Sequence, residues 1–168
     1  MTAELSLADV RRAHERIAPH VRRTPVLRPD VLTEVVGRPT PVKLELLQHS
    51  GSFKARGAFA RMLLLDPAAR AAGVVALSGG NHALAVAHAA RVLGVRATVV
   101  LPSAAPRATF ARCEADGAVV VEVATIVDGF AEAERRARAG ADFSVGEGFG
   151  KLPDRGAFVG EGRGGWTL

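Results

Sequence analysis

A lysine follows a turn of small residues, in the segment that runs from Ser50 to Gly57. This segment places Lys54 at the start of a predicted helix, next to the aromatic ring of Phe53. A helix N-terminus disfavours positive charge, and so does burial. A lysine held there as the neutral amine can attack a carbonyl carbon and form a Schiff base. The alternative is a lysine without a chemical role at a helix start, with its ammonium group in water.

A second group of residues, Ser78-Gly79-Gly80-Asn81-His82, separates a short apolar run from a predicted helix. Glycines allow a ligand to approach the backbone closely, and the free amides of a helix N-terminus attract anions. The alternative is a simple turn in which Asn81 is the helix N-cap. The glycine spacing matches neither the phosphate loop of nucleotide hydrolases nor the dinucleotide-binding fingerprint.

Composition excludes several classes of protein. The chain has 168 residues, of which 48% are hydrophobic and 23% charged, and its formal net charge is +5. These values are typical of a globular domain rather than a disordered tail, and no apolar run is long enough to span a bilayer. The basic residues are scattered and only eight residues are aromatic (seven Phe and one Trp), so we expect neither a nucleic-acid partner nor a membrane partner.

Cysteine and histidine usage gives two further expectations. The single cysteine, Cys113, allows no internal disulfide, and the charged N-terminal residues do not resemble a signal peptide. We therefore expect a cytoplasmic protein. Four of the five histidines lack metal-ligand spacing, so no metal site is expected; these four are His14, His20, His49 and His88.

The two motifs need a framework that positions them. Periodicity and capping signals predict helices near 7–20, 31–36, 52–65, 82–93, 106–116 and 130–139. Apolar or alternating runs predict strands at 42–46, 74–77, 97–101 and 118–123. Strands that alternate with helices predict a three-layer α/β fold with a parallel sheet. Ligands of such sheets bind at the carboxyl ends of the strands, which points to the loop from Ser78 to Asn81.

Taken together, the motifs strongly resemble the threonine/serine dehydratase and serine racemase family. These are pyridoxal-phosphate (PLP) enzymes of the tryptophan-synthase-β fold type (fold type II). The resemblance covers about residues 10–140 and rests on six segments: Lys43-Leu44-Glu45 with Gln48, Ser50 to Ala58, Ser78 to Ala83, Arg23-Thr24-Pro25, and the stretches Gly94 to Pro102 and Arg112 to Val123.

The resemblance implies a role for each motif residue. Lys54 would hold pyridoxal phosphate as an internal aldimine and then remove the substrate Cα proton, and Phe53 would pack near the cofactor ring. Asn81 would hydrogen-bond the ring hydroxyl oxygen of the cofactor. The substrate carboxylate would be bound by the remaining residues, which are Ser78, Gly80 and His82, together with Asn81.

The implied activity is an ammonia-lyase (dehydratase) of amino-acid metabolism. It would convert L-threonine or L-serine to a 2-oxo acid and ammonia by β-elimination. The family's racemases carry a serine where this chain has Gly79, which disfavours racemisation, and Leu84 stands where the family usually has glutamine. Three alternatives remain: a serine racemase, a truncated and inactive fragment, and a small nucleotide-binding domain.

The expected organisation is the N-terminal half of a longer enzyme, because family members are about twice this length. Residues 1–73 would form part of the large domain, residues 74–145 the small α/β domain, and residues 146–168 a glycine-rich tail. The complete protein would be a homo-oligomer that acts on a small amino acid.

Overall fold

The computed structural model describes residues 5–138 and 142–145. Its α-helices are α1 (Leu7–Ile17), α2 (Asp30–Val36), α3 (Lys54–Met62), α4 (Pro67–Ala72), α5 (Asn81–Leu93), α6 (Arg107–Ala115) and α7 (Ile126–Arg138). Its strands are β1 (Val26–Leu27), β2 (Val42–Lys43), β3 (Val74–Leu77), β4 (Ala97–Pro102), β5 (Val119–Val123) and β6 (Asp142–Val145). Three short 3-10 helices complete it: η1 (Ala18–His20), η2 (Glu45–Leu47) and η3 (His49–Gly51).

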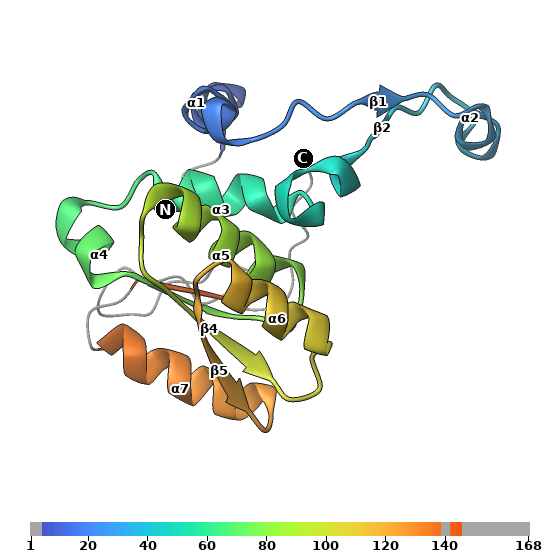
Figure 1. Cartoon of the computed structure of the whole chain (residues 1–168). Coiled ribbons are helices and arrows are strands. Elements are labelled where there is room, and N and C mark those ends of the chain that lie inside the picture. The colour runs from blue at the N-terminus through green and yellow to red at the C-terminus, as the bar shows by residue number, and fades with distance from the viewer. Residues whose placement is uncertain (1–4, 139–141, 146–168) are drawn as a thin grey trace.

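A parallel four-stranded sheet forms the centre of the molecule, in the order β5-β4-β3-β6. The inner strand β3 reads Val-Val-Ala-Leu and is buried along its whole length, as expected for a strand covered on both faces. In Figure 1, α3, α5 and α6 lie on one side of this sheet and α7 on the other. The predicted α/β class with three layers and a parallel sheet is therefore confirmed.

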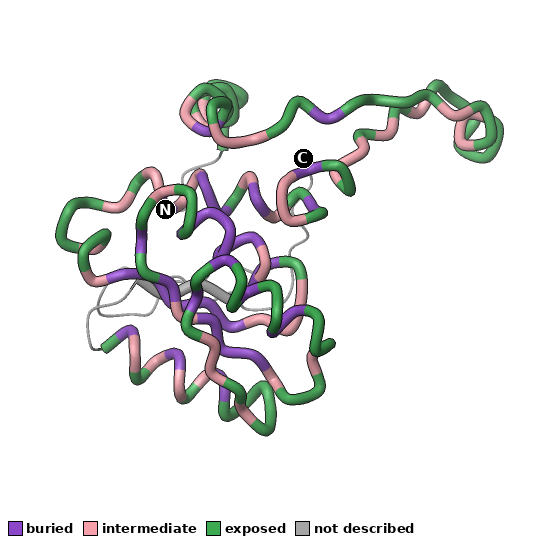
Figure 2. Tube along the Cα trace, in the orientation of Figure 1, coloured by how far each residue is buried: buried purple, intermediate pink, exposed green. Residues whose placement is uncertain are grey.

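The two faces of the sheet have separate apolar cores, which appear as buried segments of the tube in Figure 2. On one face, Phe59 of α3 and the alanines of α5 pack with Val99 and Leu101. On the other face, Ala133 and Ala137 of α7 pack with Val75, Leu77 and Val100. The alanines of α5 keep this helix close to α3 and to the sheet. The start of each helix is thereby fixed relative to the other.

An arm made of β1, α2 and β2 extends away from this body (Figure 1). Its two short strands pair antiparallel, with Val26 opposite Lys43. Helix α2 ends at Gly37, which has a left-handed backbone (φ 74°), as a glycine C-cap predicts. Among the described helices, none combines the length and the apolar character needed to cross a membrane.

Most predicted elements are present, but several differ, and the short strand β1 was not predicted. The strand expected at 42–46 ends at Lys43, and η2 follows it. Helix α7 begins at Ile126, earlier than expected, and both α4 and β6 were absent from the sequence-based prediction. The helix expected to end at His20 finishes as η1 because Pro19 lacks the amide that would continue α-helical bonding. The glycine-rich segment 146–168 lies outside the described residues.

Candidate active site

The loop from Ser78 to Asn81 leaves the carboxyl end of β3, where the order of the sheet changes direction. From β3 the chain proceeds outward through β4 and β5, and it later returns to place β6 on the opposite side of β3. The chain therefore leaves β3 toward one edge of the sheet, and the later connection from β5 to β6 runs back in the opposite direction. Such a switch point opens a crevice at the strand ends, and it is where open α/β sheets bind ligands. The topology thus places this predicted motif at the expected ligand site.

Helix α5 begins directly after this loop. Gly80 is its N-cap and Asn81 its first residue, so the alternative in which the Asn81 side chain caps the helix is wrong. No side chain caps this end; instead the Gly80 amide donates to Ser78 Oγ at 3.2 Å. A Cβ added at Gly80 would meet no other atom within 4 Å, so the backbone here is open to an approaching group. Amides of the first helical turn and the helix dipole both favour an anion at this position.

Lys54 is the first residue of α3, as the sequence predicts. Its backbone amide donates to the buried Ser52 Oγ at 3.3 Å, which helps to fix where the helix begins. Its Nζ lies 5.5 Å from the centroid of the Phe53 ring, a distance typical of a cation–π contact. Phe53 itself is half exposed, at 49% of its surface. One face of the Phe53 ring is thus available to a further planar group.

The two motifs meet at His82. This imidazole is 3% exposed, and α3 packs along α5. Burial, and then the positive charge of Lys54, lower the pKa of His82 from 6.5 to about 4. His82 is therefore neutral at physiological pH, and its ring lies within electrostatic range of the lysine. The start of α3 and the start of α5 therefore lie close enough for Lys54 and His82 to interact electrostatically, although the two residues are far apart in the sequence.

Comparison with known proteins identifies the family. The family model "Pyridoxal-phosphate dependent enzyme" matches residues 17–154. The chain belongs to the pyridoxal-phosphate-dependent enzymes. The family depends on pyridoxal phosphate as its cofactor, and this match agrees with the resemblance seen in the motifs.

Three relatives illustrate the similarity. The chain is 47% identical over 116 residues to an L-threo-3-hydroxyaspartate ammonia-lyase from a Pseudomonas species, covering 69% of this chain and 36% of that protein. It is 43% identical over 118 residues to a putative threonine dehydratase from Sinorhizobium fredii, covering 70% and 36%. The structure of maize serine racemase superposes with a TM-score of 0.77 at 34% identity, covering 84% of this chain and 44% of that one. The chain thus spans about a third of the length of these curated relatives, and the fold class is that of fold type II.

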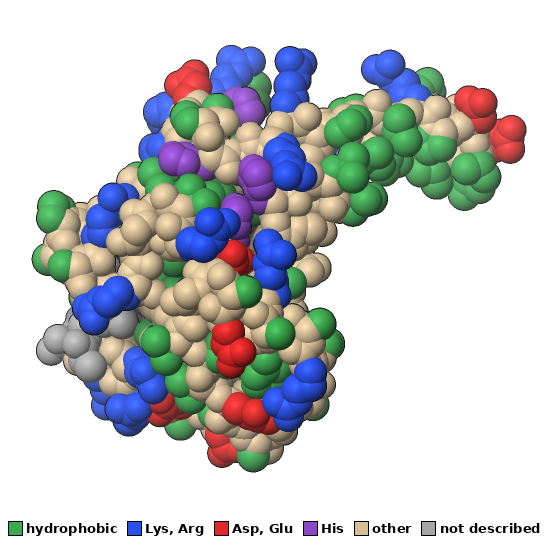
Figure 3. Space-filling model, viewed as in Figure 1, with side chains coloured by type: hydrophobic (Ala, Val, Ile, Leu, Met, Phe, Trp, Pro, Cys, Tyr) green, Lys and Arg blue, Asp and Glu red, His purple; other side chains and the backbone are tan. Residues whose placement is uncertain are grey.

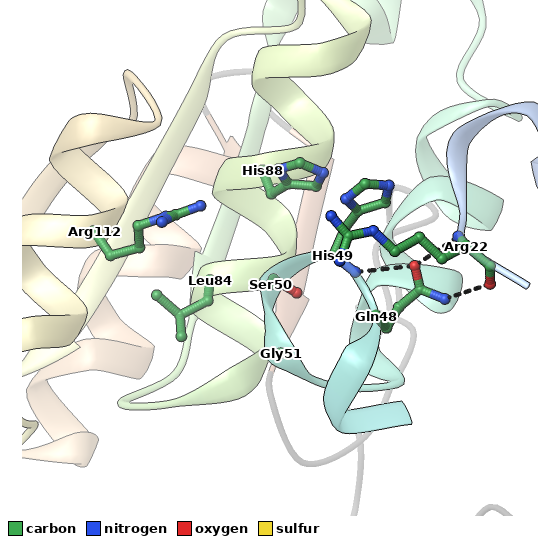
Figure 4. A pocket seen from close by; sticks show the side chains of 8 residues that line it. All are labelled: Arg22, Gln48, His49, Ser50, Gly51, Leu84, His88 and Arg112. Carbon is green, nitrogen blue, oxygen red and sulfur yellow. Dashed lines mark hydrogen bonds between the residues drawn. The ribbon is translucent and has the colours of Figure 1, made fainter. Parts of the chain in front are cut away.

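A cavity of about 400 Å³ lies beside the predicted site in this PLP-family chain. None of the six predicted site residues lines it. Its walls are Arg22, Gln48, His49, Ser50, Gly51, Leu84, His88 and Arg112 (Figure 4). Histidine side chains and basic side chains (Lys or Arg) also gather on the face of the molecule shown in Figure 3. Ser50 has a left-handed backbone (φ 60°), and its buried Oγ has no hydrogen-bond partner among the residues that the structure describes.

Part of this cavity could have been found from the sequence. Ser50 and Gly51 belong to the turn before Lys54, and Leu84 and His88 follow Asn81 on α5 at helical spacing. Arg22 and Arg112 reach the cavity only through tertiary packing, and no local pattern marks them. The rings of His49 and His88, two of the histidines that lack metal-ligand spacing, stack on one another here.

Proposed function

We propose that this chain carries the lysine-bearing part of a PLP-dependent ammonia-lyase for small β-hydroxy amino acids, with L-threonine and L-serine as the preferred substrates. The observation that carries the proposal is the meeting of Lys54 with His82 and the open start of α5, at the switch point of the sheet. An amine, a planar aromatic face and the first-turn amides of a helix are the groups that a pyridine aldehyde and an amino-acid carboxylate require.

Each residue has a distinct task in this proposal. Lys54 would hold the cofactor covalently through Nζ and, once released by the substrate, would accept the proton from the substrate Cα. Phe53 would pack against the cofactor ring, and the Asn81 amide would donate to its ring hydroxyl oxygen. When bound, the cofactor supplies an electron sink for the carbanion that deprotonation produces.

The start of α5 would bind the substrate carboxylate. The Ser78 hydroxyl and the amides near Gly80 would donate to its oxygens. The buried, neutral imidazole of His82 can donate a hydrogen bond without adding a charge. In the overall change the β-hydroxyl and the Cα proton would leave as water, and hydrolysis of the released enamine would consume one water and give a 2-oxo acid and ammonia.

Racemisation is the second candidate, because a serine racemase is among the structural relatives. Gly79 occupies the position where a second base would lie on the opposite face of the substrate, and it has no side chain. A Cβ added there would lie 3.3 Å from the Ala105 Cβ, so a side chain requires a small shift of that neighbour. The missing group favours elimination over racemisation.

We also propose that residues 1–73 belong to the large domain of the complete enzyme and residues 74–145 to its small domain. The separate sheet formed by β3 to β6 supports this division, because its strands all fall in the second range. The arm formed by β1, α2 and β2 falls in the first range.

Covalent labelling tests the role of Lys54. The chain has only three lysines, Lys43, Lys54 and Lys151. After incubation with pyridoxal phosphate and reduction with borohydride, peptide mapping should find the label mainly on Lys54. The variant Lys54→Arg should lose this label and the visible absorbance of the complex, while the matched variant Lys43→Arg should keep both. Equal labelling of all three lysines would contradict the proposal.

Product analysis separates the activities. Release of ammonia and 2-oxo acid from L-threonine or L-serine supports the lyase, and formation of D-serine supports the racemase. Selective labelling of Lys54 with neither product would identify a fragment that binds the cofactor without turnover.

A further inference from the structure

We infer that Glu45 is a positioning residue for Lys54. It acts through Arg56 and through the backbone of Arg22. This inference rests on the proposed role of Lys54. It goes further by naming the residues that fix the rotation of α3 about its own axis. That rotation directs the Lys54 side chain toward α5.

The Glu45 carboxylate is the centre of a partly buried cluster. It accepts hydrogen bonds from Arg56 Nε at 2.8 Å and Nη2 at 2.7 Å, in the two-point geometry of a guanidinium–carboxylate pair. It also accepts from Thr24 Oγ1 at 2.6 Å, and its side chain is only 13% exposed. These bonds, led by those from Arg56, lower the pKa of Glu45 and keep it charged.

The backbone of Arg22 forms hydrogen bonds with side chains from both ends of the turn that precedes Lys54. Before the turn, the buried Gln48 amide makes two bonds to Arg22, accepting from its N and donating to its O, both at 2.9 Å. After the turn, Arg56 Nη2 donates to the same Arg22 O at 3.2 Å. The dashed lines in Figure 4 mark the Gln48 contacts. The turn is therefore fixed at its two ends to one common support.

Helix geometry makes this cluster a control on the direction of Lys54. Successive residues of an α-helix are separated by about 100°, so residues two apart point in nearly opposite directions. Arg56 follows Lys54 by two residues in the first turn of α3. The Glu45–Arg56 pair therefore holds α3 from the face opposite to Lys54. Loss of the pair frees the helix start to rotate and turns the lysine away from His82.

Competitive labelling of the three lysines tests this inference. The chain is exposed briefly to pyridoxal phosphate, reduced with borohydride and mapped, and the ratio of label on Lys54 to label on Lys151 is measured. We expect Glu45→Gln to lower this ratio by about fivefold or more, because a partly buried charge-assisted pair is lost. Arg56→Gln should do the same, and the double variant should be no worse than either single variant.

A matched control uses a second two-point pair. Glu122 accepts from Arg107 at 2.9 Å through both oxygens, but this pair is exposed and lies on β5 and α6. Glu122→Gln should leave the labelling ratio unchanged. Glu45→Asp, which keeps the charge, should retain part of the selectivity that Glu45→Gln loses.

Folding is controlled by labelling each variant at a temperature well below its own midpoint of unfolding. If Glu45 has only a structural role, Glu45→Gln lowers the midpoint but leaves the ratio at the wild-type value, and the inference is overturned. If Glu45→Gln does not fold, Arg56→Gln decides by the same criterion. If the wild-type chain labels all three lysines equally, the proposed role of Lys54 fails first and removes the basis of the inference.

Discussion

The imidazole rings of His49 and His88 stack, with their centroids 5.1 Å apart and an angle of 22° between the ring planes. His49 belongs to η3, just before the turn that leads to Lys54, and His88 lies on α5. Phe59 of α3 meets the edge of the His88 ring, with centroids 5.9 Å apart. Two titratable rings therefore join the segment that carries the lysine to the helix that begins at Asn81.

Acid should weaken this contact. Burial lowers the pKa of His49, helped by the charge of Arg22. Burial also lowers the pKa of His88 despite the opposing charge of Asp116, with smaller lowering contributions from His49, Arg91 and Arg112. In the unfolded chain both rings titrate near 6.5, so protons bind the unfolded state first as the pH falls. The stability due to the pair is complete above about pH 6.5 and is lost below it.

The variant His88→Gln tests this expectation. Urea unfolding at pH 7.5 and pH 5 should show a smaller acid-dependent loss of stability in His88→Gln than in the wild type. His14→Gln, at an exposed position on α1, is the matched control and should show the wild-type loss. The expectation fails if His88→Gln and His14→Gln have the same pH dependence.

His82 should contribute a larger acid effect of its own. The pKa of His82 is 6.5 for an unperturbed imidazole, as in the unfolded chain. In the folded chain, burial and then the charge of Lys54 lower it to about 4. Stability is thus fully present above about pH 6.5 and falls until about pH 4, by up to about 3 kcal/mol. His82→Gln cannot titrate, so its unfolding free energy should depend less on pH across this window. If the unfolding free energy of His82→Gln depends on pH as steeply as that of the wild type, this assignment is refuted.

Among the described glycines that precede β3, Gly73 should lose the most stability when it is replaced by alanine. It has φ 91° and ψ −175°, and a Cβ there would lie 2.8 Å from the backbone oxygen of Arg96. Gly73→Ala should therefore destabilise the chain by about 2–3 kcal/mol, measured by urea unfolding. Gly117 also has a positive φ of 80°, but an added Cβ would meet nothing within 4 Å. Gly117→Ala should cost only about 1 kcal/mol, and equal losses would show that the Arg96 contact is unimportant.

Removal of the Asp116 charge should lower the stability of the chain more than removal of an exposed ion pair does. Its side chain is 7% exposed, and its two oxygens contact Arg91 Nε at 2.9 Å and Arg112 Nε at 3.4 Å, which ties α5 to the end of α6. Asp116→Asn leaves a buried amide facing two cations and should cost about 2 kcal/mol. Glu122→Gln removes an exposed pair and should produce no resolvable change in urea unfolding. Similar losses in the two variants would contradict this difference.

The sequence predicted the elements whose signals are local. Strands β3 and β4 are short apolar runs, and α5 ends at Gly94 with the left-handed backbone expected of a C-cap. What these elements share is that neighbouring residues alone determine them. That Lys54 and the start of α5 share one site was expected from the family resemblance and not from any local signal.

Elements that depend on distant partners were missed. The alternation from Val42 to Leu46 resembles a strand, but Glu45 bonds to Arg56 and Thr24, and the chain turns into η2 instead. Strand β6 pairs with β3, which is distant in the sequence, so nothing local marks its four residues. Arg22 and Arg112 meet at the cavity for the same reason.

The position of β6 has a consequence for how the chain is made. Strand β3 pairs with β4 on one side, but its other side gains a partner only when Asp142–Val145 has left the ribosome. Until then, the apolar strand Val74–Leu77 presents an open edge of backbone amides and carbonyls. During that interval a growing chain can pair with another copy through β3, so synthesis of β6 also closes a route to aggregation.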